Sequence, residues 1–451
     1  MNQMSSRNRK LVYMFSILAL LIPIGALGMP ARERSQPGQP GQSGGKIARL
    51  RHEYRLGETT LGDVDPASAT MNLVLLGMRG VAGTMLWMQA DEQKRMKNWS
   101  ELEQTTESII KLQPRFLDVW QFQGWNLAYN VSVECDAVED RFFWVKKGVK
   151  FMLRGTNQNE DASPLYHDTG TMMGKKMGRS DEHKQFRRYF KSDPDPRWEG
   201  QADEEINPNG QDNYLVAKEY YNIANEKELL PWVEQHIMER TLFRSYPARS
   251  QMDYATAIEN DGQFDEVTVN AWKTAHEDWT NVYGREDFLT TGGGIIKLGA
   301  TDEELQQLAD EDPNNDVASK RNWLDRYQKM TNYPYWAARS KVESEPEMVE
   351  TRRKLYEGKK LFFKQDILQA RELLESGLND LQAIFEKHPI LLDEQEMVED
   401  IIKSQLMWFY VLRISGEPNP ETFPMMNVWN QNPALVSEMD QRLQERVSDG
   451  L

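Results

Sequence analysis

Histidines are the first side chains to consider as metal ligands or catalytic bases, and this sequence of 451 residues contains six. They are His52, His167, His183, His236, His276 and His388. No two of them are three or four positions apart, which is the spacing that places two ligands on one face of a helix. The His-Glu-x-x-His motif of zinc hydrolases is also missing from the sequence. The histidines therefore indicate packed or solvated side chains, and they predict no metal site.

An acidic stretch at residues 310–316 alternates like the first half of a calcium-binding loop. Such a loop requires glycine at its sixth position and glutamate at its twelfth. Here those positions hold Asn315 and Arg321. We interpret the stretch as an acidic turn at the end of a helix, with weak calcium binding as the alternative.

Nucleotide binding and nucleophilic catalysis have equally little support. The triple glycine at 292–294 precedes Lys297, but it lacks the spacing and the Lys-Ser/Thr pair of a phosphate-binding loop. No nucleophile elbow is supported, because the one Gly-x-Ser-x-Gly match, at residues 41–45, lies in a low-complexity linker, and the single cysteine, Cys135, has no histidine near it in the sequence. One thiol also excludes an intramolecular disulfide and a cysteine-rich zinc site. We therefore predict that the protein is not an enzyme and uses no cofactor.

The overall charge of the chain argues against nucleic acid as a partner. The formal net charge is −16, and no cluster of Lys and Arg offsets it. Because phosphate backbones are bound by clustered basic side chains, we predict no nucleic-acid partner. Charged residues make up 27% and apolar residues 39% of the chain, which favours a soluble, largely helical body.

A pair formed by an aromatic residue or leucine and, four positions later, a small residue recurs along the chain. The pairs are Leu86 and Ala90, Trp120 and Gly124, and Tyr166 and Gly170. The first two pairs are 34 residues apart, and the third follows after 46. This period, with a proline ending the second helix of a unit, resembles the tetratricopeptide repeat. The resemblance implies stacked helical hairpins with a concave face for peptides or proteins, and it implies no catalytic residue.

The best match to the repeat pattern comes near the C-terminus. Its positions are Gly358, Leu361, Ala370, Leu374 and Gly377. A helix beginning near Asp366 would form the second half of this unit, and an apolar helix over 393–414 would cap the array.

Three short sequence segments also resemble those of a membrane-anchored repeat family of planctomycete-type bacteria. They are Leu-Gln-Pro-Arg-Phe at 112–116, Trp-Asn-Leu-Ala-Tyr-Asn at 125–130 and Phe-Arg-Ser-Tyr-Pro-Ala at 243–248. The resemblance covers most of residues 70–410.

The N-terminus predicts a membrane anchor. Residues 1–10 form a basic tail, and residues 11–29 are uncharged and mostly apolar, close to the ~20 residues that a membrane-spanning helix needs. We favour an uncleaved signal anchor over a signal peptide cut after Gly28, because the apolar run is longer than a usual signal core. The protein is then a single-pass membrane protein, with most of the chain outside the cytoplasm on the periplasmic side.

The predicted fold class is all-α, with hairpins like those of the tetratricopeptide repeat forming a right-handed superhelix, plus one N-terminal transmembrane helix. The predicted segments after the anchor are a flexible linker and lead-in (30–70), N-terminal repeats (71–190), an acidic proline-rich loop (191–213), central helical repeats with an irregular insert (214–345), a C-terminal repeat with its capping helix (346–415) and a tail (416–451).

These features predict a membrane-anchored scaffold or adaptor that binds a protein partner at the cell envelope. The predicted partner-binding residues are Trp120, Trp125, Asn126, Asn130 and Tyr166. Two alternatives stay open. One is an envelope enzyme or solute-binding component with a carboxylate-based site in the central inserts, and the other is an accessory subunit of a transport or secretion complex.

Overall fold

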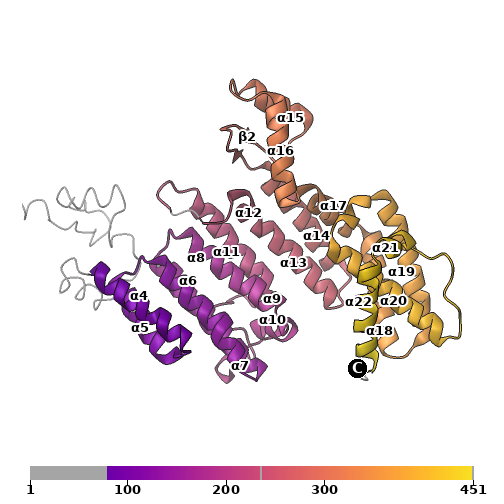
Figure 1. Cartoon of the computed structure of the whole chain (residues 1–451), viewed down its shortest axis with the longest axis horizontal. Coiled ribbons are helices and arrows are strands. Elements are labelled where there is room, and N and C mark those ends of the chain that lie inside the picture. Colours follow the sequence, from indigo (N-terminus) through magenta and orange to yellow (C-terminus); the bar gives the residue numbers. More distant parts are fainter. Residues whose placement is uncertain (1–78, 234–235, 449–451) are drawn as a thin grey trace, which may run out of the picture. The chain divides into compact units, whose positions relative to one another are not determined.

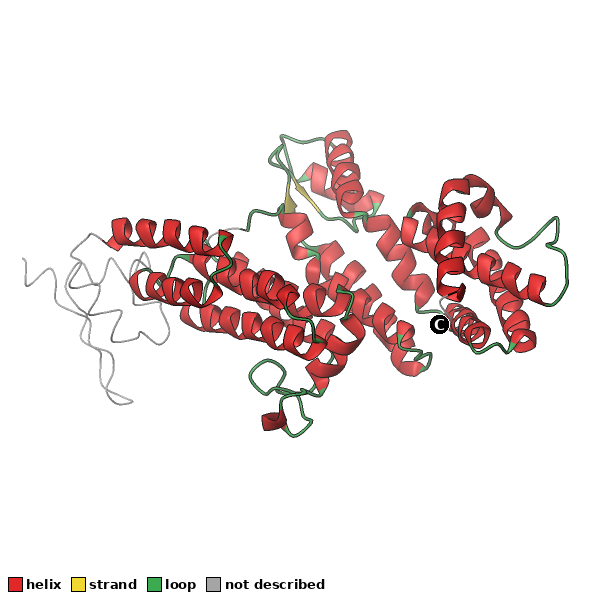
Figure 2. Ribbon diagram, turned by 60° about the horizontal axis from the view of Figure 1, so that its bottom comes forward, coloured by secondary structure: helices red, strands yellow, loops and turns green. Residues whose placement is uncertain are grey.

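The computed structural model describes residues 79–233 and 236–448, and the chain divides into two compact units. The described part of unit 1 is 79–169 and 226–233, and that of unit 2 is 170–225 and 236–448. The predicted all-α class is confirmed, since helices account for nearly all regular structure in these ranges (Figures 1 and 2). None of the described helices is long and apolar enough to cross a membrane, and the predicted anchor at 11–29 lies outside the described residues.

Unit 1 consists of helical hairpins. Its elements are α4 (Arg79–Arg95), α5 (Trp99–Leu112), α6 (Leu117–Trp125), a π-helical turn (Asn126–Val131), a 3-10 turn (Ser132–Glu134) and α7 (Val138–Gln158). Helix α8 (Ser163–Thr171) begins in unit 1 and ends in unit 2. Helix α5 has the bounds that its apolar period predicts, because Leu102, Ile109 and Ile110 recur at helical spacing and are buried.

The hairpin of α6 and α7 depends on small residues at its seam. A Cβ atom added to Gly148 on α7 would lie 2.8 Å from the Gly124 carbonyl oxygen and 3.1 Å from the Ala128 nitrogen. Both neighbours are backbone atoms, which cannot rotate away as a side chain can. The two helices therefore approach closely where Gly148 faces the backbone of Gly124, and the missing side chain of Gly148 permits this approach.

We expect Gly148→Ala to lower the free energy of unfolding by up to about 2 kcal/mol. The steric cost of about 1–3 kcal/mol is partly offset by about 1 kcal/mol, since alanine favours a helix more than glycine does. Gly80→Ala in α4 is the matched control, because its added Cβ would meet only the Gln113 side chain at 3.9 Å. Urea unfolding followed by circular dichroism measures both variants, and equal stability of the two would contradict the prediction.

Unit 2 contains the remaining helices. They are α9 (Met177–Arg179), α10 (His183–Lys191), α12 (Arg240–Arg244), α13 (Tyr246–Asn260), α14 (Glu266–Glu277), α15 (Asp302–Asp310), α16 (Val317–Thr331), α17 (Tyr333–Glu343), α18 (Pro346–Phe363), α19 (Ile367–Lys387), α20 (Gln395–Ile414), α21 (Met426–Gln431) and α22 (Pro433–Ser448). Helix α11 (Asn213–Glu228) begins in unit 2 and ends in unit 1. Short 3-10 turns occupy Pro196–Trp198, Tyr283–Arg285 and Pro389–Asp393.

The C-terminal hairpin lies where the repeat pattern predicts it. Asp366 caps α19 by accepting a hydrogen bond from the Gln369 backbone N–H. Beyond it, the segment predicted as a tail is largely helical, because α22 packs on α20 and the Tyr410 hydroxyl donates to Asp440 at 3.0 Å.

The insert at 284–332 is more regular than its sequence suggests. It holds an antiparallel hairpin of β1 (Phe288–Leu289) and β2 (Ile295–Ile296), followed by α15 and α16. A capping box formed by Thr301 and Glu304 begins α15. The acids of the calcium-like stretch have other partners, since Asp316 caps α16 and Asp312 pairs with the buried Lys320 at 3.0 Å. We therefore retain the interpretation of a structural turn.

The described residues also contain three π-helical turns, which were not predicted from the sequence. They are Asn126–Val131, Met172–Lys176 and Asp278–Val282, which continue α6, α8 and α14 respectively. An inserted π turn changes the direction in which the following side chains point, and such turns are often found at functional sites.

Candidate functional site

Two of the predicted partner-binding residues belong to the core of unit 1, which corrects their placement on an interaction surface. Trp120 is 0% exposed, and its indole N–H donates to the Pro114 carbonyl oxygen at 3.0 Å. Asn126 is 1% exposed. The repeat pattern that singled out Trp120 thus marks a packing position, as large aromatic residues at helical spacing usually do.

The other three predicted residues are accessible to different degrees. Trp125 is half-buried and stacks on Tyr129, with 4.2 Å between ring centroids. Asn130 is exposed, and Tyr166 is half-buried with its hydroxyl 3.5 Å from the Thr156 carbonyl oxygen. Their role in binding a partner stays a prediction.

Unit 2 has two adjoining recesses, which share Arg179, Met252, Asp253 and Trp336. The smaller one, here the Arg249 recess, has a volume of about 90 Å³ and is completed by Gly174, Lys175, Tyr221, Tyr246, Arg249 and Ser250. The larger one, here the Arg187 recess, has a volume of about 310 Å³. Its other charged side chains are Lys184, Arg187, Asp261, Arg339 and Glu396.

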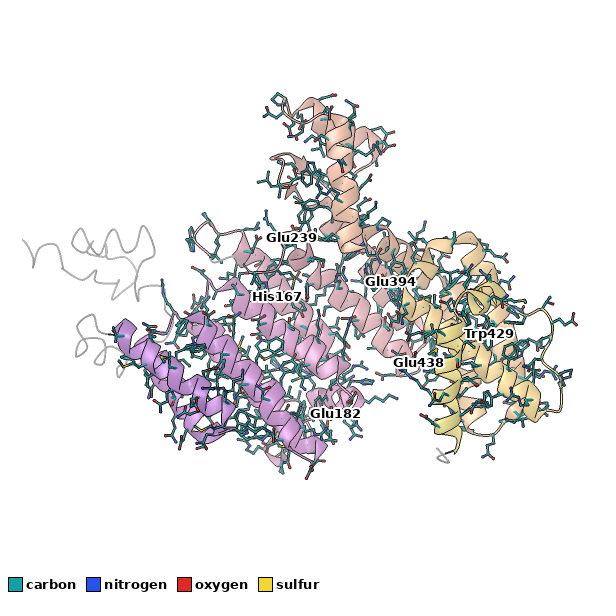
Figure 3. The ribbon with its side chains drawn as sticks, in the orientation of Figure 1. His167, Glu182, Glu239, Glu394, Trp429 and Glu438 are labelled. Carbon is teal, nitrogen blue, oxygen red and sulfur yellow. The ribbon has the colours of Figure 1, made fainter. Side chains whose placement is uncertain are left out.

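Five helical segments position the Arg249 recess. The π turn Met172–Lys176 and α9 supply Lys175 and Arg179, α11 supplies Tyr221, and α17 supplies Trp336. Helix α13 contributes Tyr246, Arg249, Ser250 and Asp253, whose spacing of three, four and seven residues places them on one face. Figure 1 shows α9, α10 and α13 close to one another, and Figure 3 labels Glu182, the residue before α10.

The carboxylate of the Arg249 recess is already paired. An oxygen of Asp253 lies 2.6 Å from Nη2 of Arg179. Burial raises the pKa of Asp253, while the charges of Arg179, Lys175 and Arg249 act in the opposite direction. Pairing of Asp253 with Arg179 leaves Lys175 and Arg249 as excess cations.

Arg249 has no carboxylate partner within the described residues. Its Nε donates to the Ser245 hydroxyl at 3.0 Å, and its Nη2 donates to the Thr331 carbonyl oxygen at 2.8 Å. Its guanidinium carbon lies 5.5 Å from the ring centroids of both Trp279 and Trp336. Burial lowers the pKa of Arg249, the direction expected for a cation removed from water without a full counter-charge.

Lys175 is the second excess cation. Its ammonium group donates to the Tyr246 hydroxyl at 2.9 Å and lies 4.1 Å from the centroid of that ring. Since an ammonium group has three donors, Lys175 keeps hydrogen-bonding capacity for a ligand.

In the Arg187 recess most charges are satisfied within the protein. Arg187 is 5% exposed and lies 2.8 Å from Asp212 and 2.7 Å from Asp261. Arg339 donates to Glu396 at 3.3 Å. Lys184 is exposed and forms no ion pair with the described residues, so it adds to the positive charge at the surface.

The arrangement suits binding better than nucleophilic chemistry. The Ser250 hydroxyl donates to the Tyr214 carbonyl oxygen at 2.7 Å, and Nδ1 of His183 lies 2.9 Å from the Ser180 carbonyl oxygen. Serine and histidine are therefore each engaged with backbone instead of with one another. The three carboxylates that line the recesses each have an arginine partner, which makes them poor ligands for a metal ion.

Sequence reasoning missed these residues because charged helical positions usually face solvent. The available signals were the basic pair Lys175 and Arg179, four positions apart, and the spacing of Tyr246, Arg249 and Asp253.

No family model, curated protein or solved structure matches this chain. The resemblance to the tetratricopeptide repeat therefore stays a prediction.

Proposed function

We propose that this chain is a non-catalytic scaffold that binds a protein partner through the two recesses of unit 2. The observation that supports this most strongly is their charge. They are lined by six Lys and Arg side chains and three carboxylates, on a protein whose net charge is −16. A local positive surface on an acidic protein selects a partner with a complementary acidic surface.

The composition of the recesses supports the same proposal. Trp336, Tyr221 and Tyr246 line the Arg249 recess beside Arg179 and Arg249. Tryptophan, tyrosine and arginine contribute most of the binding free energy at many protein interfaces. The surface thus has both the large rings that gain from burial and the donors that fix orientation.

The proposal includes the membrane anchor at 11–29, a periplasmic location and a right-handed superhelix of repeats. These elements depend on the sequence pattern: a basic tail, a long apolar run and the 34-residue period. An anchored scaffold of this kind would hold its partner at the cell envelope.

The test is affinity capture from native membranes through a C-terminal tag, followed by lysine-directed cross-linking and mass spectrometry. With a carbodiimide as the cross-linker, which activates carboxylates for attack by lysine amines, we expect a stoichiometric partner whose acidic peptides become joined to Lys184 by an amide bond. We expect Lys184→Glu to reduce the recovery of this partner about tenfold. Lys273→Glu is the matched control, because Lys273 is exposed on α14 and lies outside both recesses.

Recovery of the partner at the wild-type level by Lys184→Glu would contradict docking at these recesses. A Trp125→Ala variant, captured in the same way, distinguishes docking on unit 1 from docking at the recesses of unit 2. If only Trp125→Ala loses the partner, the docking surface is in unit 1 and the assignment to unit 2 is wrong.

A further inference from the structure

We infer that the Arg249 recess is a site for one oxyanion group, and that its occupant is a side-chain carboxylate from an acidic segment of the protein partner. This inference rests on the proposed function, to which it adds the chemistry of recognition. Two features of the recess support it: a partly buried guanidinium with donors to spare, and a second cation placed on the same small volume.

The hydrogen bonds of Arg249 leave one edge of its guanidinium available. Nε and Nη2 are used by Ser245 and Thr331, and Nη1 has no acceptor among the described residues. Trp279 and Trp336 hold the group at 5.5 Å from each ring centroid. A guanidinium fixed in this way loses little side-chain entropy on binding, and its planar donors match an oxyanion.

Among the described residues, no carboxylate is left over to neutralise this group. Asp253 is the only carboxylate lining the Arg249 recess, and it pairs with Arg179 at 2.6 Å. Lys175 donates only to a neutral hydroxyl, that of Tyr246. A partly desolvated arginine and lysine without a full counter-charge are unfavourable in the free protein, so an entering anion would gain strong, weakly screened interactions with both.

The dimensions favour one carboxylate attached to a longer chain. A volume of about 90 Å³ accommodates a small group such as a carboxylate or a phosphate. The adjoining Arg187 recess, with about 310 Å³ and the exposed Lys184, continues the surface for neighbouring residues of the same segment. A free phosphate ion would use the Arg249 recess alone, and this difference separates the two sources of oxyanion.

The experiment uses the full chain and a fluorescein-labelled hexaglutamate peptide, with binding followed by fluorescence anisotropy at several salt concentrations. We expect saturable binding that weakens with salt, and we expect Arg249→Gln and Lys175→Gln each to raise the dissociation constant about tenfold or more. Lys273→Gln removes the same charge from an exposed position outside both recesses, and it should change the constant by less than about twofold. Circular dichroism and the unfolding midpoint show whether each variant is folded. If Arg249→Gln does not fold, Lys175→Gln alone still tests the site.

Competition identifies the occupant. We expect excess unlabelled hexaglutamate to displace the labelled peptide, and a hexaglutamine peptide not to do so. Inorganic phosphate that binds in an Arg249-dependent way while hexaglutamate does not bind would overturn the assignment to an acidic segment. Hexaglutamate binding that both recess variants leave unchanged would overturn the site itself. Neither outcome bears on membrane capture, so a partner still recovered through Lys184 would leave the proposed function standing.

Discussion

Glu343→Ala is expected to lower the free energy of unfolding of unit 2 by about 3–5 kcal/mol, the cost of removing one partner from a buried ion pair. Glu343 is 1% exposed and accepts two hydrogen bonds from Arg352, at 2.5 Å from Nη2 and 3.1 Å from Nε. Removing this carboxylate leaves the Arg352 guanidinium buried with a weaker partner, Asp400, at 3.7 Å. Because Asp400 recovers part of the lost interaction, we expect a value towards the lower end of that range.

An exposed pair on α18, the helix that carries Arg352, provides the matched control. Glu350 and Arg353 form a 2.6 Å ion pair in which both side chains are more than two-fifths exposed. Glu350→Ala should cost only about 0–1 kcal/mol, since water screens such pairs. The double replacement Glu343→Met with Arg352→Met should recover stability relative to Glu343→Ala, because it removes the uncompensated charge. Urea unfolding measures all three, and equal losses for Glu343→Ala and Glu350→Ala would contradict the buried pair as a main source of stability.

This buried pair also supports the candidate site. Glu343 lies at the end of α17, the helix that presents Trp336 and Arg339 to the recesses. Nε of Arg339 is 4.0 Å from the Glu343 carboxylate, while its Nη1 donates to Glu396. Helix α17 therefore contributes both to stability and to the recesses. Loss of Glu343 should weaken the packing of this helix and so disturb the position of Trp336.

The fold could be predicted where successive turns of a helix place an apolar or a small residue on the same buried face. Helix α5 buries Leu102, Ile109 and Ile110, which recur at helical spacing in the sequence. The C-terminal hairpin could be predicted for a similar reason, because its glycines lie where the two helices pack closely. An added Cβ would lie 2.8 Å from Leu374 at Gly358 and 2.8 Å from Leu355 at Gly377. Periodicity of this kind is local, so a sequence alone reveals it.

The candidate site could not be predicted in the same way, because it depends on which charged side chains are removed from water. Lys320 and Arg187 look like surface residues in the sequence, yet they are 2% and 5% exposed and have carboxylate partners. The partner of Arg187, Asp261, lies 74 residues further along the chain. Trp120 shows the converse error, since an aromatic residue assigned to a binding face lies in the core. The π turn that carries Lys175 has no sequence signature that we recognised.

Glu259 should make unit 2 less stable as the pH rises through neutrality. It is 9% exposed and accepts a 2.8 Å hydrogen bond from the Trp272 indole. Burial, followed by the charge of Glu343, raises the pKa of Glu259 from 4.5 to about 8. Because the folded pKa exceeds the unfolded one, the neutral carboxyl stabilises the fold fully below about pH 4.5, and this contribution is lost between about pH 4.5 and pH 8. The loss is about 3–5 kcal/mol, at about 1.4 kcal/mol per pH unit.

Glu259→Gln isolates this effect, since glutamine cannot ionise and its carbonyl oxygen can still accept from Trp272. We expect the variant and the wild type to have similar stability at pH 5, and the variant to be more stable by about 3–5 kcal/mol at pH 8.5. Glu266→Gln, at an exposed position in the first turn of α14, removes a carboxylate without a buried environment and should give no such divergence. Urea unfolding from pH 5 to pH 9 measures the three curves. Parallel curves for Glu259→Gln and the wild type would mean that Glu259 is ionised in the folded protein, with Arg352 and Arg339 outweighing its burial and the charge of Glu343.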